Sequence, residues 1–254
     1  MRTFMRARSA ARGDAWALPV AAVALLAASC GGPGAAQHPL TNRLDPGYGG
    51  LKLATLGAMP FWSDISENED PDHLSGPMAE SKFYRALGPN TGFTVLTSSE
   101  VGALLEKSGK TAQLAAFYKK WVRDQDDVDK SLVQFVAQQM KVDAVIVGAV
   151  DVWDQQKVDI TESGTARTSV GLLVGLIDGA TGKTLWVGRD ENYKEALRYV
   201  PGTEQGRAGT QAQRSGVERT NLRTATGVYA PPDFSDVVDI VVASLVKAFP
   251  PRRT

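Results

Sequence analysis

The sequence predicts one α/β (α+β) domain, in which helices flank a mixed, partly antiparallel sheet of about four to five strands. Residues 142–153 (VDAVIVGAVDVW) are apolar on both faces of an extended chain, which indicates a central strand. Residues 168–178 and 183–188 are two more apolar runs, and the glycine-bounded segment between them has the length of a hairpin loop. Residues 234–249 carry apolar side chains at helical spacing, so we expect a helix that lies across the sheet.

Strands and helices alternate before the central strand. Proline lacks the N–H that a strand ladder needs, so Pro60 should end the first strand. Serine can cap a helix by accepting a bond from a free backbone N–H. In chain order we expect a strand at 51–61, a helix at 77–87 that ends at Gly88-Pro89, a strand at 93–97, and a helix from Ser98 or Ser99 to about Glu106.

Two further helices are predicted before the central strand, and a polar stretch follows the hairpin. Residues 114–122 and 128–140 both place apolar side chains at helical spacing, and Asp126-Asp127 would favour the N-terminus of the second helix. Residues 189–232 lack periodicity, which predicts an excursion from the sheet. The last helix should begin at Asp233 or Ser235 and end at Pro250-Pro251.

The N-terminus has the layout of a secretory signal. Four arginines precede an apolar run, and small residues lead from it to Cys30, the only cysteine in the chain. The segment Leu26-Ala27-Ala28-Ser29-Cys30 resembles the lipobox of bacterial lipoproteins, and the resemblance implies cleavage between Ser29 and Cys30 and a lipid on Cys30. An ordinary signal peptide with a coincidental cysteine is the alternative. The apolar run covers about 14 residues, whereas roughly 20 are needed to span a bilayer.

These features divide the chain into three parts. Residues 1–29 are expected to be a lipoprotein signal peptide, residues 30–50 a flexible tether rich in glycine and proline, and residues 51–254 the domain, with its polar excursion at about 189–232. Gly31 stands where an inner-membrane retention signal would place aspartate, so lipoprotein sorting implies the outer membrane, facing the periplasm. The lipid on Cys30 would hold the protein on a membrane without spanning it.

Composition limits the partners and the chemistry. Without residues 1–29 the chain keeps 24 basic and 27 acidic side chains, a net charge of about −3, which argues against nucleic acid as a partner. Lipidation of Cys30 would leave no thiol for catalysis or for a disulfide. The chain has two histidines and contains no serine-hydrolase or zinc-protease motif. We therefore expect no enzymatic activity, no metal and no cofactor.

Three local patterns are better explained by structure than by ligand binding. Gly182-Lys183-Thr184 resembles the end of a phosphate-binding loop, but Ile177 replaces a required glycine, which argues against a nucleotide site. Asp64 and the residues after it resemble a calcium loop, but Glu69 stands in place of its glycine. The aromatic residues of 117–121 could form a docking surface, and burial in the core is the stronger interpretation.

Two segments carry a resemblance to a group of small envelope lipoproteins. They are KVDAVIVGAVDV, residues 141–152, and VGLLVGLIDGATGKTLW, residues 170–186. This pattern resembles that of the penicillin-binding-protein activator lipoproteins, the curli-secretion lipoprotein and the TolB N-terminal domain. The resemblance implies a TolB N-terminal-domain-like fold. It implies function less directly, because the matching residues are strand, turn and core positions.

The resemblance and the anchor together predict a non-enzymatic accessory lipoprotein that binds an envelope protein, such as a peptidoglycan synthase. One alternative is a subunit of an oligomeric curli-like secretion channel, although residues 154–168 and 189–230 carry too many charges for membrane hairpins. The other alternative is an envelope hydrolase that uses carboxylates, with Asp64, Glu67 and Asp70 as the first residues to test.

Overall fold

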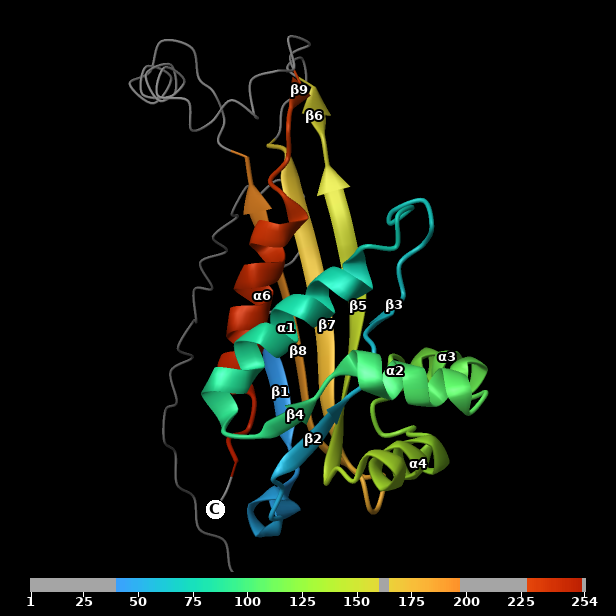
Figure 1. Cartoon of the computed structure of the whole chain (residues 1–254). Helices are drawn as coiled ribbons and strands as arrows, with labels where there is room; N and C mark the ends of the chain where they lie inside the picture. The colour runs from blue at the N-terminus through green and yellow to red at the C-terminus, as the bar shows by residue number, and fades with distance from the viewer. Residues whose placement is uncertain (1–39, 160–164, 197–227, 253–254) are drawn as a thin grey trace, which may run out of the picture. The chain divides into compact units, whose positions relative to one another are not determined.

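The computed structural model describes residues 40–159, 165–196 and 228–252 and is built on a seven-stranded sheet (Figure 1). The strand order is β1-β8-β7-β5-β2-β4, with β3 also paired to β5. β6 (Val158–Asp159) and β9 (Val228–Tyr229) form a separate two-stranded sheet. The seven strands are β1 (Thr41–Leu44), β2 (Thr55–Ala58), β3 (Trp62–Ser63), β4 (Thr94–Leu96), β5 (Ala144–Gln156), β7 (Arg167–Asp178) and β8 (Thr184–Glu195).

One half of the sheet is parallel and the other half is antiparallel. β4, β2 and β5 run parallel to one another, and helices make the connections between them. α1 (Ser75–Thr91) precedes β4, while α2 (Ser98–Lys107), α3 (Thr111–Trp121) and α4 (Lys130–Met140) lie between β4 and β5. β7 pairs antiparallel with β5 and with β8, and β8 pairs antiparallel with β1, which confirms the predicted meander. The mixed α/β prediction is therefore confirmed, with more strands than the four to five expected.

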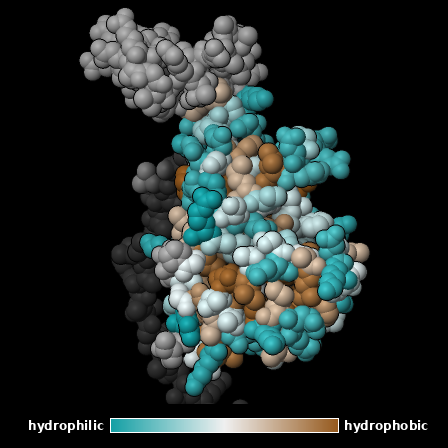
Figure 2. Space-filling model, in the orientation of Figure 1, coloured by the Kyte–Doolittle hydropathy of each residue, from teal (hydrophilic) through white to brown (hydrophobic). Residues whose placement is uncertain are grey.

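Helices cover both faces of the sheet, and a separate apolar core lies under each set (Figure 1). α1 and α6 (Phe234–Ala248) pack over Ile146 and Leu172, whereas α2, α3 and α4 pack over Val145 and Val147. Figure 2 shows the first of these faces, where hydrophobic residues gather below α1 among hydrophilic ones. In the parts of the chain that the structure describes, no helix has the length and apolarity needed to cross a membrane.

In both cores an aromatic ring packs closely against a glycine of the sheet. A Cβ added at Gly148 would lie 2.3 Å from a ring carbon of Phe61, on the α1 side of the sheet. A Cβ at Gly175 would lie 2.6 Å from the indole of Trp121, on the opposite side. Both distances are shorter than any van der Waals contact, so the close approach of these rings requires glycine. The sequence pattern alone does not predict which ring each glycine accepts.

The helices begin and end close to their predicted boundaries, with different capping residues. Thr97, not Ser98 or Ser99, caps α2 and forms a capping box with Glu100. Asp129 caps α4 through the amides of Ser131 and Leu132, three residues after Asp126. The predicted cap at Asp233 is confirmed for α6. α1 continues past Gly88-Pro89 to Thr91, because Gly92 supplies the left-handed residue that ends it.

The predicted tether and polar excursion both include residues that the structure places in the fold. Residues 41–44 form β1, which pairs with β8, and a 3₁₀ helix over Pro46–Gly50 buries Tyr48. The prediction of a tether over 30–50 is thus wrong at its C-terminal end. β1 is an exposed edge strand, and such a strand can pair without the alternation of apolar residues that would reveal it in a sequence. β8 likewise extends to Glu195, into the predicted excursion, most of which lies outside the described residues.

Candidate functional site

The predicted lipidation and cleavage residues, Cys30 and Ser29, lie outside the described residues. The described residues begin at Leu40, and the first strand, β1, begins at Thr41. Ten residues, 31–40, therefore separate Cys30 from the first strand. A fully extended chain spans at most about 3.6 Å per residue, so this segment reaches no further than about 35 Å. A lipid on Cys30 would keep the domain within that distance of the membrane surface.

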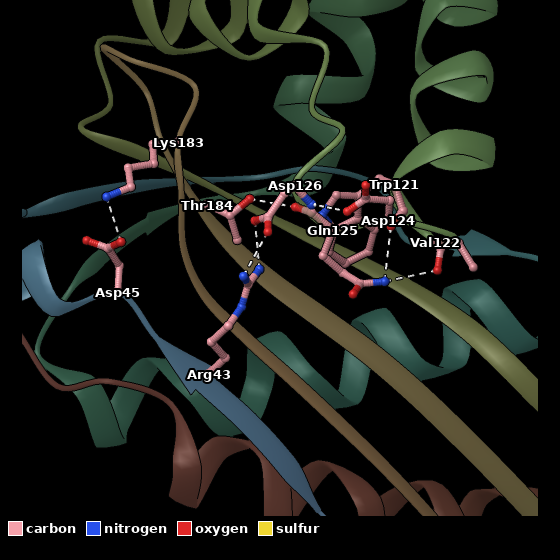
Figure 3. Close-up of polar contacts among 9 residues, drawn as sticks. All are labelled: Arg43, Asp45, Trp121, Val122, Asp124, Gln125, Asp126, Lys183 and Thr184. Atoms are coloured by element: carbon pink, nitrogen blue, oxygen red, sulfur yellow. Dashed lines mark hydrogen bonds and ion pairs between the residues drawn. The ribbon is translucent and has the colours of Figure 1, made fainter. Parts of the chain in front are cut away.

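Two ion pairs hold β1 where the chain joins the sheet (Figure 3). The guanidinium of Arg43 donates two hydrogen bonds, of 2.7 and 2.8 Å, to the carboxylate of Asp126 between α3 and α4. The ammonium of Lys183, in the turn between β7 and β8, lies 2.6 Å from the carboxylate of Asp45. The first pair joins β1 to the loop between α3 and α4, and the second joins the residue after β1 to the turn between β7 and β8. All four residues of β1 are exposed.

The two pairs border a groove of about 410 Å³, which we call the junction groove. Its wall includes Arg43 and Asp45, Asp126, Lys130 and Lys183. The hydrogen bond and charge of Asp126 raise the pKa of Arg43, and the same contact lowers the pKa of Asp126. A hydrogen bond from Lys183 is the main reason that the pKa of Asp45 is lowered. Arg43 and Asp126 neutralise each other, as do Lys183 and Asp45, which suits these four groups to holding β1 in place.

The Gly182-Lys183-Thr184 segment is fully used by the turn between β7 and β8. Gly182 adopts a positive φ of 68°, and Lys183 pairs with Asp45. The hydroxyl of Thr184 donates to the carbonyl of Gln125 at 2.6 Å, and the Gln125 amide in turn donates to carbonyls at the end of α3 (Figure 3). The segment thus ties the β-hairpin to the loop between α3 and α4.

The acidic residues between β3 and α1 do not converge on one point. Asp64 and Glu67 are exposed, whereas Asp70 is only 5% exposed and accepts hydrogen bonds from the amides of Leu74 and Ser75. Both oxygens of Asp70 are therefore committed to the start of α1. Across the described ranges, no group of three or more His, Cys, Asp or Glu side chains is placed to hold a metal ion.

The aromatic residues of the α3 stripe belong to the core. Phe117, Tyr118 and Trp121 are each at most 1% exposed, and the Tyr118 hydroxyl donates to the carbonyl of Pro60 at 2.7 Å. Burial raises the pKa of the Tyr118 phenol far above its usual value. Trp153 is also buried and stacks on Phe234, with ring centroids 4.0 Å apart. The interpretation of these residues as core is confirmed.

Two features of the site could not be found from sequence. Arg43 and Asp126 are 83 residues apart, and neither belongs to a motif. Asp190 lies in a stretch read as part of the polar excursion, yet it is only 4% exposed. The register of β8 accounts for this, since Asp190 pairs with Leu172 and so points to the face that α6 covers. The apolar residues of 184–195 end before this position, so the sequence pattern does not show that the strand continues and buries Asp190.

No protein-family model and no curated protein matches the chain. Solved structures do match it, among them lipoproteins. Lipoprotein GNA1162 from Neisseria meningitidis has 16% sequence identity and a TM-score of 0.37, over 64% of this chain and 98% of that one. The PelC dodecamer from Paraburkholderia phytofirmans has 11% identity and a TM-score of 0.42, over 83% and 98%. The LpoB C-terminal domain from Salmonella enterica has 15% identity and a TM-score of 0.31, over 56% and 85%.

Proposed function

We propose that this protein is a lipoprotein of the bacterial cell envelope, which binds an envelope protein and catalyses no reaction. The observation that carries the proposal is the position of Cys30, which directly follows Leu26-Ala27-Ala28-Ser29 and is separated from β1 by ten residues. Each buried acyl methylene contributes about 0.8 kcal/mol, so two or more chains on Cys30 would anchor the domain stably.

The polar clusters of the described domain support binding rather than catalysis. Asp70 caps α1, and both carboxylates of the junction groove, Asp45 and Asp126, are held in ion pairs. A general acid or base needs a carboxylate that can exchange protons with a substrate, and such residues usually have strongly shifted pKa values in a cleft. The carboxylates named here serve helix ends and strand edges instead.

The finer part of the proposal concerns place and partner. Gly31 after the cysteine favours the outer membrane, and a reach of about 35 Å would keep the domain near the inner surface of that membrane. The resemblance of residues 141–152 and 170–186 to the activator lipoproteins makes a peptidoglycan synthase the partner to test first.

The anchor is tested by producing the chain in a bacterium that is fed labelled palmitate. We expect label and membrane association for the wild type, and neither for Cys30→Ser, which removes the only thiol. Ser29→Ala is the matched control, since it keeps a small residue before the cut and should be processed normally. A labelled, membrane-bound Cys30→Ser protein would exclude this anchor.

The partner is tested by placing a photo-crosslinking amino acid at three exposed apolar positions in intact cells. Leu44, Leu74 and Ile240 are 45%, 52% and 42% exposed, so substitution there should leave the fold intact. We expect at least one position to give a discrete product that mass spectrometry identifies as a peptidoglycan synthase, and Cys30→Ser to abolish that product. Products with other envelope proteins only would replace the synthase, and no product at any position would contradict a protein-binding role.

A further inference from the structure

Asp190 is a buried carboxylate that lies between β8 and α6. It is 4% exposed, and among the described residues its Oδ2 has no hydrogen-bond partner. It points to the same face of the sheet as Leu172, its neighbour on β7, and that face is covered by Val241 and Leu245 of α6. A buried carboxylate with one oxygen left without a hydrogen bond is costly in its charged form and less so when protonated.

No charged side chain on the packed elements compensates Asp190. Its pKa is raised by burial, and is lowered only by the hydroxyl of Ser244 on α6 and by the backbone amide of Glu191, so that the net direction is upward. The charged groups of the neighbouring elements pair elsewhere or lie on other surfaces. They are Lys194 with Asp236, Lys82 with Asp239, the exposed Lys247 of α6, Arg189 with Asp151 and Glu191, Arg43 of β1 with Asp126, Arg167 and Asp178 of β7, and the exposed Glu195 at the end of β8.

The position of Asp190 links α6 to the point where the chain enters the sheet. Thr41 of β1 pairs with Arg189, so antiparallel register brings Leu40 to the side of Asp190. Leu40 packs against the same core that α6 closes. A charge at Asp190 would draw water into this contact and would therefore weaken the packing of both α6 and Leu40.

We propose that Asp190 is a protonation-controlled latch, which holds α6 closed on β8 when its carboxyl is neutral and loosens the helix when it is ionised. The Lys82–Asp239 pair at 2.6 Å still ties α6 to α1 in both states. Loosening is therefore local to the helix and its contact with Leu40, and the rest of the sheet keeps its core. The latch responds to the pH of the compartment and needs no ligand.

Hydrogen–deuterium exchange of the peptides that cover α6 tests the latch on the full chain purified in detergent. Rates are compared at a series of pH values from about 4 upward, because the pKa of Asp190 is raised above its usual value, and they are corrected for intrinsic exchange. We expect α6 of the wild type to exchange several-fold faster at the upper end of the series. Asp190→Asn, which cannot ionise, should exchange slowly throughout.

Two further variants separate the latch from a general effect of acid. Ser244→Ala removes a hydroxyl that favours the charged carboxylate, so the transition should move to higher pH. Glu195→Gln removes an exposed acid from the end of β8, the strand that carries Asp190, and should keep the wild-type pH dependence. A wild type without a pH effect on α6, or an Asp190→Asn protein with the same effect as the wild type, would overturn the proposal. If Asp190→Asn fails to fold by circular dichroism, the Ser244→Ala midpoint decides.

Discussion

Asp70 before α1 and Asp190 beneath α6 are buried to the same extent, at 5% and 4% exposure, yet their surroundings shift their pKa values in opposite directions. Burial raises the pKa of both. At Asp70 the hydroxyl of Ser75 and the amides of Ser75 and Leu74 outweigh burial, so the pKa falls below its usual value. At Asp190 the contacts are too few and the pKa stays raised. At equal exposure, the number of hydrogen-bond donors in reach sets the direction in which the pKa of the carboxylate moves.

The largest expected effect is the loss of Asp70. Asp70→Ala leaves the amides of Leu74 and Ser75 without their acceptor at a buried helix start. Hydrogen bonds to a charged group are worth about 1.5–3 kcal/mol, so we expect urea unfolding at neutral pH to show a loss of about 2–3 kcal/mol. Asp70→Asn keeps one acceptor oxygen and should lose less. Equal stability of Asp70→Ala and the wild type would mean that the cap contributes nothing.

Removing the charge of Asp190 should have the opposite sign. Asp190→Asn keeps the shape of the side chain and deletes a buried charge whose Oδ2 has no hydrogen-bond partner among the described residues. We expect this variant to be more stable than the wild type at neutral pH, by about 1.4 kcal/mol for each pKa unit of the native shift. Differential scanning calorimetry at neutral pH measures it. A destabilised Asp190→Asn would show that the charge is favourable where it lies.

The two aspartates also predict opposite pH limbs of stability. The native pKa of Asp70 is lowered, so its contribution is present above about 3.8, the unfolded value, and disappears as pH falls through the native pKa. The native pKa of Asp190 is raised, so its contribution is present below about 3.8 and disappears as pH rises through the native pKa. Urea midpoints are measured across this range of pH. Asp70→Asn should lose part of the fall in stability toward acid pH, and Asp190→Asn should lose part of the fall in stability that the wild type shows as pH rises. Parallel curves for both variants and the wild type would contradict the assignment.

The sequence predicts the elements with a repeating buried face and misses those that depend on distant partners. The central strand, the hairpin and the stripes of α3, α4 and α6 follow from periodicity, because a buried face must repeat with the geometry of its element. β1 and β3 could not be predicted in this way. They are four and two residues long, and their pairing with β8 and β5 depends on partners more than 80 residues away.

The same limit applies to the site. The sequence does not identify Asp70 as a helix cap, because nothing in 64–72 shows that two amides at the start of α1 meet its carboxylate. Asp190 looked solvent-exposed because its neighbours Arg189 and Glu191 are polar, although they point to the other face of the sheet. A polar residue in a strand reveals its burial only when register and covering helix are known.

The smallest expected effect separates pKa direction from stability. The pKa of Asp126 is lowered, chiefly by its hydrogen bond from Arg43, as that of Asp70 is lowered by its donors. The side chains of Arg43 and Asp126 are, however, 58% and 59% exposed, so water screens the pair and competes for its hydrogen bonds. Arg43→Ala should therefore cost less than about 1 kcal/mol in urea unfolding, and added salt should reduce even that difference. A loss as large as that of Asp70→Ala would show that β1 depends on this ion pair. It would also mean that a lowered pKa reflects the same stabilisation at an exposed carboxylate, Asp126, as at a buried one, Asp70.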